Sequence, residues 1–187
     1  MNEYKKELEL YEQLNEIAVK GEVVVFGSAF AKNIPVSELA QTYGIDRCVY
    51  NRSFGDMSAA DALNLAEKAV LPLQPKKIIL QLGETDLERG YKSVTEIIKD
   101  YNELIRKFRE NNKRVKIVIL SVCSEENETD KLNIALENIA HKTKCQFVDV
   151  SGSVHAENPY LKVFSEIRLF IPDKINFCDA MSFAGAY

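Results

Sequence analysis

The sequence is poor in histidine and in closely spaced cysteines. It has two histidines, His141 and His155, and four cysteines that lie far apart with no C-x-x-C pair. Neither histidine has the spacing of a zinc ligand, so we expect no metal site. Unpaired cysteines in or beside apolar runs are typical of buried free thiols in a reducing compartment.

Long hydrophobic runs and blocks of positive charge are also missing. The longest apolar runs, Val23–Phe26, Lys77–Leu82 and Lys116–Val122, have the length of strands and fall far short of a membrane span. The formal net charge is −4 without a polybasic run, which argues against nucleic acid or an anionic membrane as a partner. The charged N-terminal stretch has no signal-peptide core, and with the free thiols it predicts a cytoplasmic protein. The oligomeric state stays open.

What is present is ordinary globular material. The 187 residues, 46% of them hydrophobic, are enough for one domain with a substantial core. Residues 1–21 are expected to form an N-terminal helix packed on the domain, with Leu10, Leu14 and Ile17 on one face. Residues 22–187 are expected to form the domain itself.

Apolar runs of strand length alternate with amphipathic segments through the first 150 residues. The expected strands are 22–27, 47–51, 76–83, 115–122 and 145–150, and the expected helices between them are 34–44, 56–70, 94–111 and 128–143. This alternation predicts an α/β fold: a three-layer α/β/α sandwich, flavodoxin-like, around a parallel five-stranded sheet. Beyond Val150 the pattern weakens, and a long irregular segment is expected.

Several small or polar residues directly follow the expected strands. They are Ser28, Gly55, the run Gly83–Asp86 and Ser121. In open parallel sheets the ligand lies outside the carboxyl ends of the strands, so these residues are expected to meet at one edge.

The order of these segments resembles the SGNH/GDSL hydrolase family of esterases, lipases and acylhydrolases, over roughly residues 22–187. "VVVFGSAF" resembles the family's first block, with Ser28 at the nucleophile position, and "YNRSFGDMSAADAL" resembles the second, with Gly55 at the oxyanion hole. "IILQLGETDL" resembles the third block, with Thr85 where the family has Asn, and "DAMSFAGAY" resembles the tail of the fifth, which begins here at Asp179.

The resemblance implies a serine esterase mechanism. Ser28 would attack, and its own amide, that of Gly55 and Thr85 would stabilise the oxyanion, each donor contributing roughly 3 kcal/mol. The catalytic residues would be Ser28, His155 and Asp179, because His155 follows the fifth strand and an aspartate can orient it. Asp149 and Asp173 are alternatives to Asp179 for that role.

Three departures from the family pattern leave two functions open. Gly27 stands where the family has Asp, Thr85 replaces Asn, and the fifth block has Asp179 or Ala180 where the family has histidine. The first function is an ester hydrolase acting on a small acyl ester. The second is a catalytically degenerate domain that binds a carbohydrate or acyl ligand without turnover. The loop "GSAFAKNIP" has no phosphate-binding glycine pattern, which disfavours a nucleotide binder, and no cofactor is expected.

Overall fold

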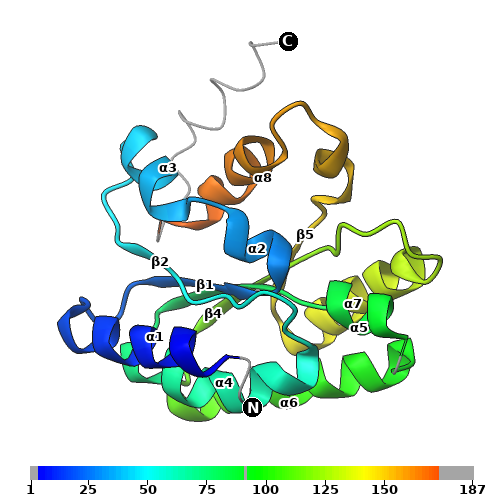
Figure 1. Ribbon diagram of the computed structural model, residues 1–187, viewed down its shortest axis with the longest axis horizontal. Coiled ribbons are helices and arrows are strands. Elements are labelled where there is room, and N and C mark those ends of the chain that lie inside the picture. Colours follow the sequence, from blue (N-terminus) through cyan, green and yellow to red (C-terminus); the bar gives the residue numbers. More distant parts are fainter. Residues whose placement is uncertain (1–3, 91, 173–187) are drawn as a thin grey trace.

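The computed structural model of the protein describes residues 4–90 and 92–172. A five-stranded parallel sheet of order β2-β1-β3-β4-β5 lies between two layers of helices (Figure 1). The predicted three-layer α/β/α sandwich is therefore confirmed. The strands are β1 (Val23–Gly27), β2 (Val49–Asn51), β3 (Lys77–Gln81), β4 (Lys116–Leu120) and β5 (Gln146–Val148).

The helices divide between the two faces of the sheet (Figure 1). One side holds α1 (Lys5–Ile17), α4 (Ala59–Ala69), α6 (Val94–Asn111) and α7 (Thr129–Thr143), and the other holds α2 (Ala29–Asn33), α3 (Val36–Thr42) and α8 (Pro159–Ile167). The short α5 (Glu84–Arg89) follows β3, and the described residues also form the 3-10 turns η1 (Leu71–Leu73), η2 (Ser151–His155) and η3 (Arg168–Phe170).

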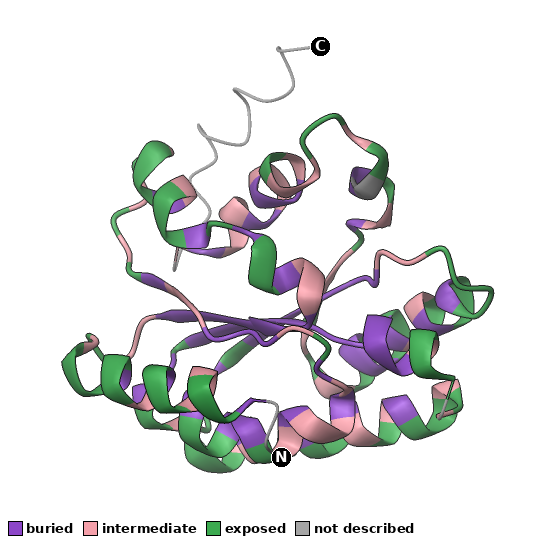
Figure 2. Ribbon diagram, in the orientation of Figure 1, coloured by how far each residue is buried: buried purple, intermediate pink, exposed green. Residues whose placement is uncertain are grey.

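The central strands are buried on both faces, as Figure 2 shows by the purple band through the middle of the molecule. Successive side chains of a strand point to opposite faces. Val24 and Phe26 therefore pack in the core with α4, α6 and α7, and Val25 packs in the other core with α3 and α8. This double burial explains why the middle residues of the central strands are apolar and show no polar alternation.

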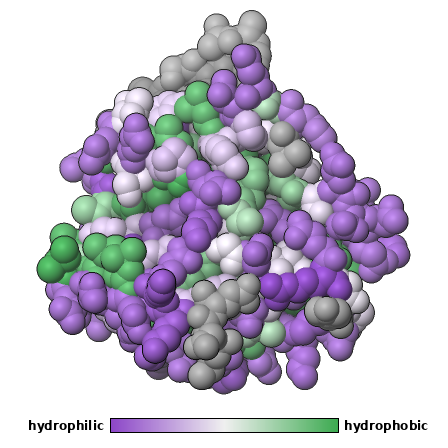
Figure 3. Space-filling view, in the orientation of Figure 1, coloured by the Kyte–Doolittle hydropathy of each residue, from purple (hydrophilic) through white to green (hydrophobic). Residues whose placement is uncertain are grey.

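The N-terminal helix packs with a different face from the one that its leucines suggest. Leu10 is 51% exposed and Ile17 is 83% exposed. The buried residues of α1 are Tyr11 and Asn15, and the Asn15 amide donates to the carbonyls of Lys68 and Ala69 in α4. Specific hydrogen bonds to α4 thus orient the helix, and hydrophobic atoms stay on the surface at its C-terminal end (Figure 3).

Three further differences from the sequence predictions have local causes. The segment after Val150 is not irregular throughout, because Pro159 starts α8 and its residues Phe164 and Ile167 are buried. Cys48 is exposed because it precedes the short edge strand β2, while Cys123 and Cys145 are half-buried; all three are free thiols. The helices α2 and α5 are too short for a periodic signal. In the described part of the chain, no helix combines the length and the apolar character needed to cross a membrane.

Candidate functional site

The candidate site lies where the chain changes direction across the sheet. From β1 the chain passes to β2 on one side and then to β3 on the other, so the crevice at the carboxyl ends of β1 and β3 is the topological switch point. The β1–β3 pairing continues past the strand, because the Ser28 amide donates to the Gln81 carbonyl at 3.0 Å. Ser28 and the segment after Gln81 therefore meet at this crevice.

Gly27 is required by close packing at the end of β1. A Cβ at this position would lie 2.2 Å from the Gln81 carbonyl oxygen and 2.6 Å from Ala31 Cβ. The first contact is with backbone of the neighbouring strand, which cannot move aside. The Asp that the family has before its nucleophile would not fit at position 27, because the backbone of the neighbouring strand leaves no room for a side chain.

Ser28 is fully buried and its hydroxyl is already engaged. The residue has 0% exposed surface, and its Oγ donates to Glu84 Oε2 at 2.9 Å. It precedes α2 without capping it through its side chain, and the next residue, Ala29, is the half-buried first residue of that helix. The hydroxyl thus points into a polar cluster inside the protein.

Glu84 is the centre of that cluster. Its side chain is buried, and its carboxyl group accepts hydrogen bonds from Ser28 Oγ, from Gln81 Nε2 at 2.5 Å and from the Phe30 amide at 3.3 Å. Burial raises the pKa of Glu84, and the hydrogen bonds from Gln81, Ser28 and Phe30 oppose that shift. Ser28 and Glu84 therefore form a buried hydroxyl–carboxyl pair.

The rest of the third block is also buried and serves the fold. Asp86 Oδ2 accepts a hydrogen bond from the Ala59 amide at 2.9 Å, which fixes the start of α4. Burial raises the pKa of Asp86. Thr85, expected at the oxyanion hole, is only 3% exposed. Gly83 has a φ of 121°, and a Cβ there would lie 2.6 Å from Leu132 Cδ2, so only glycine fits.

Gly55 does come to the same edge. The Phe54 amide donates to the Gly27 carbonyl at 3.0 Å, which ties the loop after β2 to the end of β1. Gly55, next along the chain, is half-buried. The structure thus brings Ser28, Gly55 and Thr85 to one edge, as the sequence predicts.

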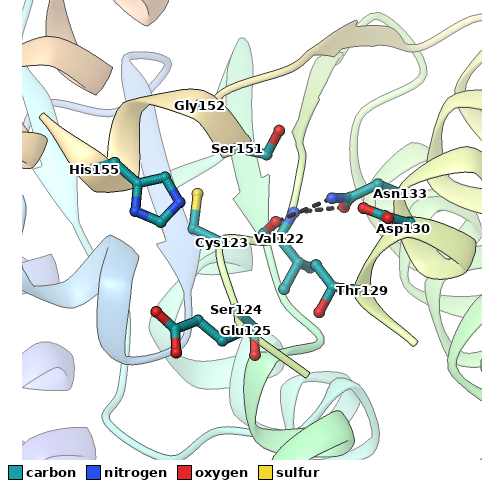
Figure 4. A pocket seen from close by; sticks show the side chains of 10 residues that line it. All are labelled: Val122, Cys123, Ser124, Glu125, Thr129, Asp130, Asn133, Ser151, Gly152 and His155. Carbon is teal, nitrogen blue, oxygen red and sulfur yellow. Dashed lines mark hydrogen bonds between the residues drawn. The ribbon is translucent and has the colours of Figure 1, made fainter. Parts of the chain in front are cut away.

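The histidine candidate belongs to a different part of that edge. His155 ends η2 and is exposed, and it lines a pocket of about 340 Å³ together with Cys123, Glu125 and Thr129 (Figure 4). Ser28 is not among the residues that line this pocket. The structure places His155 with the ends of β4 and β5, and among the described residues the Ser28 hydroxyl is bonded to Glu84 and not to His155.

The aspartates proposed to orient His155 are placed as follows. Asp149 Oδ1 accepts hydrogen bonds from Ser121 Oγ at 2.9 Å and from both the amide and the hydroxyl of Ser151. These bonds from Ser151 and Ser121 lower the pKa of Asp149, partly opposed by burial. Asp173 and Asp179 lie outside the described residues.

The sequence reasoning gave no role to Glu84 or Gln81. Glu84 lies in the quoted run "GETD" and follows a strand, which marks it as an edge residue. Its contact with Ser28, 56 positions earlier, depends on the β1–β3 pairing. A carboxylate at the start of a helix is normally interpreted as stabilising the helix dipole, so the sequence gives no reason to expect a buried pair between Glu84 and Ser28.

Comparisons with known proteins give matches by structure only. The sequence matches no protein family and no curated protein. A protein from Streptococcus pneumonia has 17% identity and a TM-score of 0.78, with 91% of this chain and 94% of that chain covered. A GDSL-like lipase from Bacteroides thetaiotaomicron has 15% identity and a TM-score of 0.74, covering 88% and 96%. A lipase/acylhydrolase from Enterococcus faecalis has 12% identity and a TM-score of 0.66, covering 82% and 98%.

In broad terms, the protein has the fold of a parallel α/β/α sandwich with a switch point between β1 and β3. More narrowly, the fold is that of the SGNH/GDSL lipases and acylhydrolases, as the sequence resemblance implied. At this level of identity the likeness establishes the fold, and the chemistry has to be argued from the residues.

Proposed function

We propose that this protein is a ligand-binding domain built on the SGNH/GDSL hydrolase fold, in which Ser28 does not act as a nucleophile. One observation carries the proposal: Ser28 has 0% exposed surface and its hydroxyl donates to the buried Glu84 carboxyl. Attack on an ester needs the oxygen to reach the carbonyl carbon at about 3–3.5 Å. A buried hydroxyl that donates its hydrogen bond to an interior carboxyl does not meet that condition.

The surroundings of Ser28 support the same conclusion. Ala29, the half-buried residue that opens α2, has no functional group. Gly27 leaves no room for an acidic side chain, and Thr85 is nearly fully buried. His155 lines the pocket at the ends of β4 and β5. No described imidazole is therefore paired with Ser28, and the polar cluster around Glu84 acts as a structural core of the crevice.

The test is covalent labelling of Ser28. Wild type and Ser28→Ala are incubated with a serine-directed fluorophosphonate beside an active serine esterase, and each is analysed by intact mass. We expect the esterase to be labelled, and both forms of this protein to stay at their unmodified mass. Hydrolysis of p-nitrophenyl acetate should be equal for the two forms. An adduct on wild type that Ser28→Ala removes would overturn the proposal.

One observation favours a second candidate, an ester hydrolase in which Glu84 replaces histidine. The Ser28 Oγ–Glu84 Oε2 distance of 2.9 Å is within reach for general-base catalysis, and burial raises the pKa of Glu84. This candidate requires the crevice to open so that Ser28 meets a small acyl ester. It predicts that Glu84→Gln abolishes a Ser28-dependent esterase activity, whereas the binding proposal predicts no such activity in either protein.

A further inference from the structure

The exposed hydrophobic side chains of the protein gather on one segment. Among the described residues, six large hydrophobic side chains are exposed, and four of these belong to α1 or to the two residues after it: Leu10, Leu14, Ile17 and Val19. Ile17 is 83% exposed, and Figure 3 shows hydrophobic atoms at this end of the helix. Single exposed hydrophobic residues are normal on a protein surface, whereas a group of four indicates a surface that another molecule covers.

Three of these residues form a continuous stripe along α1. Leu10, Leu14 and Ile17 are spaced by four and then three positions, so they lie on the same side of the helix. This spacing is that of the residues through which one helix packs lengthwise against another. The stripe is separate from the face that packs on the domain, where Tyr11 and Asn15 are buried. The helix α1 therefore has two packing faces, and only one of them is used within the described chain.

Buried hydrogen bonds prevent α1 from turning its stripe inward. The Tyr11 hydroxyl donates to the Ser53 carbonyl at 2.7 Å. The Asn15 side chain donates to the Ala69 carbonyl at 3.0 Å and accepts from Arg52 Nε at 3.0 Å. Rotation of the helix would break these bonds and leave buried polar groups without partners, which is unfavourable. The stripe is therefore held on the surface, where a second molecule can reach it.

The charges beside the stripe indicate what that molecule is. Lys6 lies in the first turn of α1 and Glu16 in the last, which is opposite to the arrangement that the helix dipole favours. Both side chains are exposed, and neither forms an ion pair with another described residue, whereas Glu7 of the first turn pairs with Lys32. In two antiparallel α1 helices, the start of each lies beside the end of the other. The Lys6 of one copy and the Glu16 of the other then attract each other.

We propose that α1 is the interface between two copies of this chain, packed antiparallel about a two-fold axis. Such an interface joins the same surface of both copies, so the stripe of Leu10, Leu14 and Ile17 on each copy covers that of the other. One helix face per copy makes a small interface, for which we expect a dissociation constant of about 1–100 µM. The interface does not involve Ser28, so this inference does not depend on the proposed function.

The first experiment is sedimentation equilibrium of the full chain over a range of concentrations. The average mass is expected to rise from that of one chain to that of two chains between about 1 µM and about 300 µM. A mass that stays at one chain over this range, or one that continues to rise beyond two chains, would overturn the inference.

Two matched variants test the location of the interface. Ile17→Glu places a charge in the stripe and is expected to weaken dimerisation at least about tenfold, with the unfolding temperature of the single chain unchanged because the side chain is exposed. Ile134→Glu makes the same change at an exposed position of α7, which is separated from α1 by α4 and α6, and should leave the affinity unchanged. Equal affinity of the two variants would overturn the assignment of α1.

A charge exchange tests the antiparallel arrangement. Lys6→Glu and Glu16→Lys are each expected to weaken dimerisation about threefold or more, because each brings two like charges together across the interface. The double variant restores opposite charges and should recover the affinity of the wild type. Lys6→Glu also improves the match to the helix dipole, so it should weaken the dimer without destabilising the single chain. No weakening by the single changes, or no recovery in the double variant, would overturn the antiparallel pairing.

Discussion

Two regions at the same edge of the sheet differ in how they use polar side chains. In the crevice between β1 and β3, Ser28 and Glu84 are buried and pair with each other. In the pocket beyond β4 and β5, Glu125 and His155 are exposed, and the buried Thr129 hydroxyl has no partner in the part of the chain that the structure describes. In the first region most polar groups pair with one another, and Gln81 Oε1 is buried without a partner among the described residues, whereas the charged groups of the second region face solvent.

This difference shows that the location of a site on a fold does not decide its role. The crevice occupies the switch point, where ligands bind in open α/β sheets. Here the buried Glu84 carboxyl occupies the crevice and accepts hydrogen bonds from Ser28, Gln81 and the Phe30 amide. Changes in the crevice should therefore reduce stability more than changes at the exposed residues of the pocket.

The largest effect is expected for Gly27→Asp. The new side chain would overlap the Gln81 carbonyl oxygen, which is 2.2 Å from the position of a Cβ. Overpacking costs about 1–3 kcal/mol in side-chain cores, and a clash with backbone should reach or exceed about 3 kcal/mol. Urea unfolding measures this loss. Gly152→Asp is the control, since no atom lies within 4 Å of its Cβ position, and similar losses for both variants would contradict the close packing at Gly27.

Glu84→Ala should be the next most damaging change. It leaves the Gln81 amide, the Ser28 hydroxyl and the Phe30 amide without their common acceptor. Unsatisfied buried donors cost about 1–3 kcal/mol, so we expect a loss of about 2–3 kcal/mol in the free energy of unfolding. Glu125→Ala, which removes an exposed carboxylate from the pocket, should stay within about 0.5 kcal/mol of wild type. If Glu84→Ala lost no more free energy of unfolding than Glu125→Ala, the crevice would be solvated.

A smaller effect concerns the pH dependence of stability. Because burial raises the pKa of Glu84, the folded state keeps this proton at a pH where the unfolded chain has lost it. The stability of the wild type relative to Glu84→Gln should therefore fall as pH rises from about 4.3 through the raised pKa. Urea unfolding of both proteins at about pH 5 and pH 8 measures this difference. A difference that grows toward pH 8 would mean that the three hydrogen bonds outweigh burial.

The smallest change is in thiol reactivity, with no loss of stability. The pKa of Cys123 is raised to about 12, whereas Cys48 is exposed. Because the thiolate is the reactive form, iodoacetamide at neutral pH should modify Cys48 at least about tenfold faster than Cys123. Peptide mapping after timed labelling measures both rates. In urea the two cysteines should be modified at equal rates, which serves as the reference. Equal modification rates of Cys48 and Cys123 in the folded protein would contradict the partly buried, negatively charged surroundings of Cys123.

Much of the fold follows from local sequence patterns. The apolar runs at 22–27, 76–83 and 115–122 predict strands that the structure contains, because strands buried on both faces are predominantly apolar. Ser58 and Asp61, three residues apart, form a capping box at the start of α4, which is a purely local pattern. The leucines of α1 do not mark the face on which it packs, because the hydrogen bonds of Asn15 to Lys68 and Ala69 orient the helix and carry no periodic signal.

The sequence by itself determined the strand–helix alternation, the parallel sheet and the edge at which Ser28, Gly55 and Thr85 meet, because these depend on short-range periodicity and on the connection rules of parallel sheets. Only the tertiary structure decided which partner Ser28 has and which pocket His155 lines. Those contacts join residues far apart in the chain, and their chemistry depends on burial. A serine that looks like a nucleophile in sequence is, in the folded protein, a donor to Glu84.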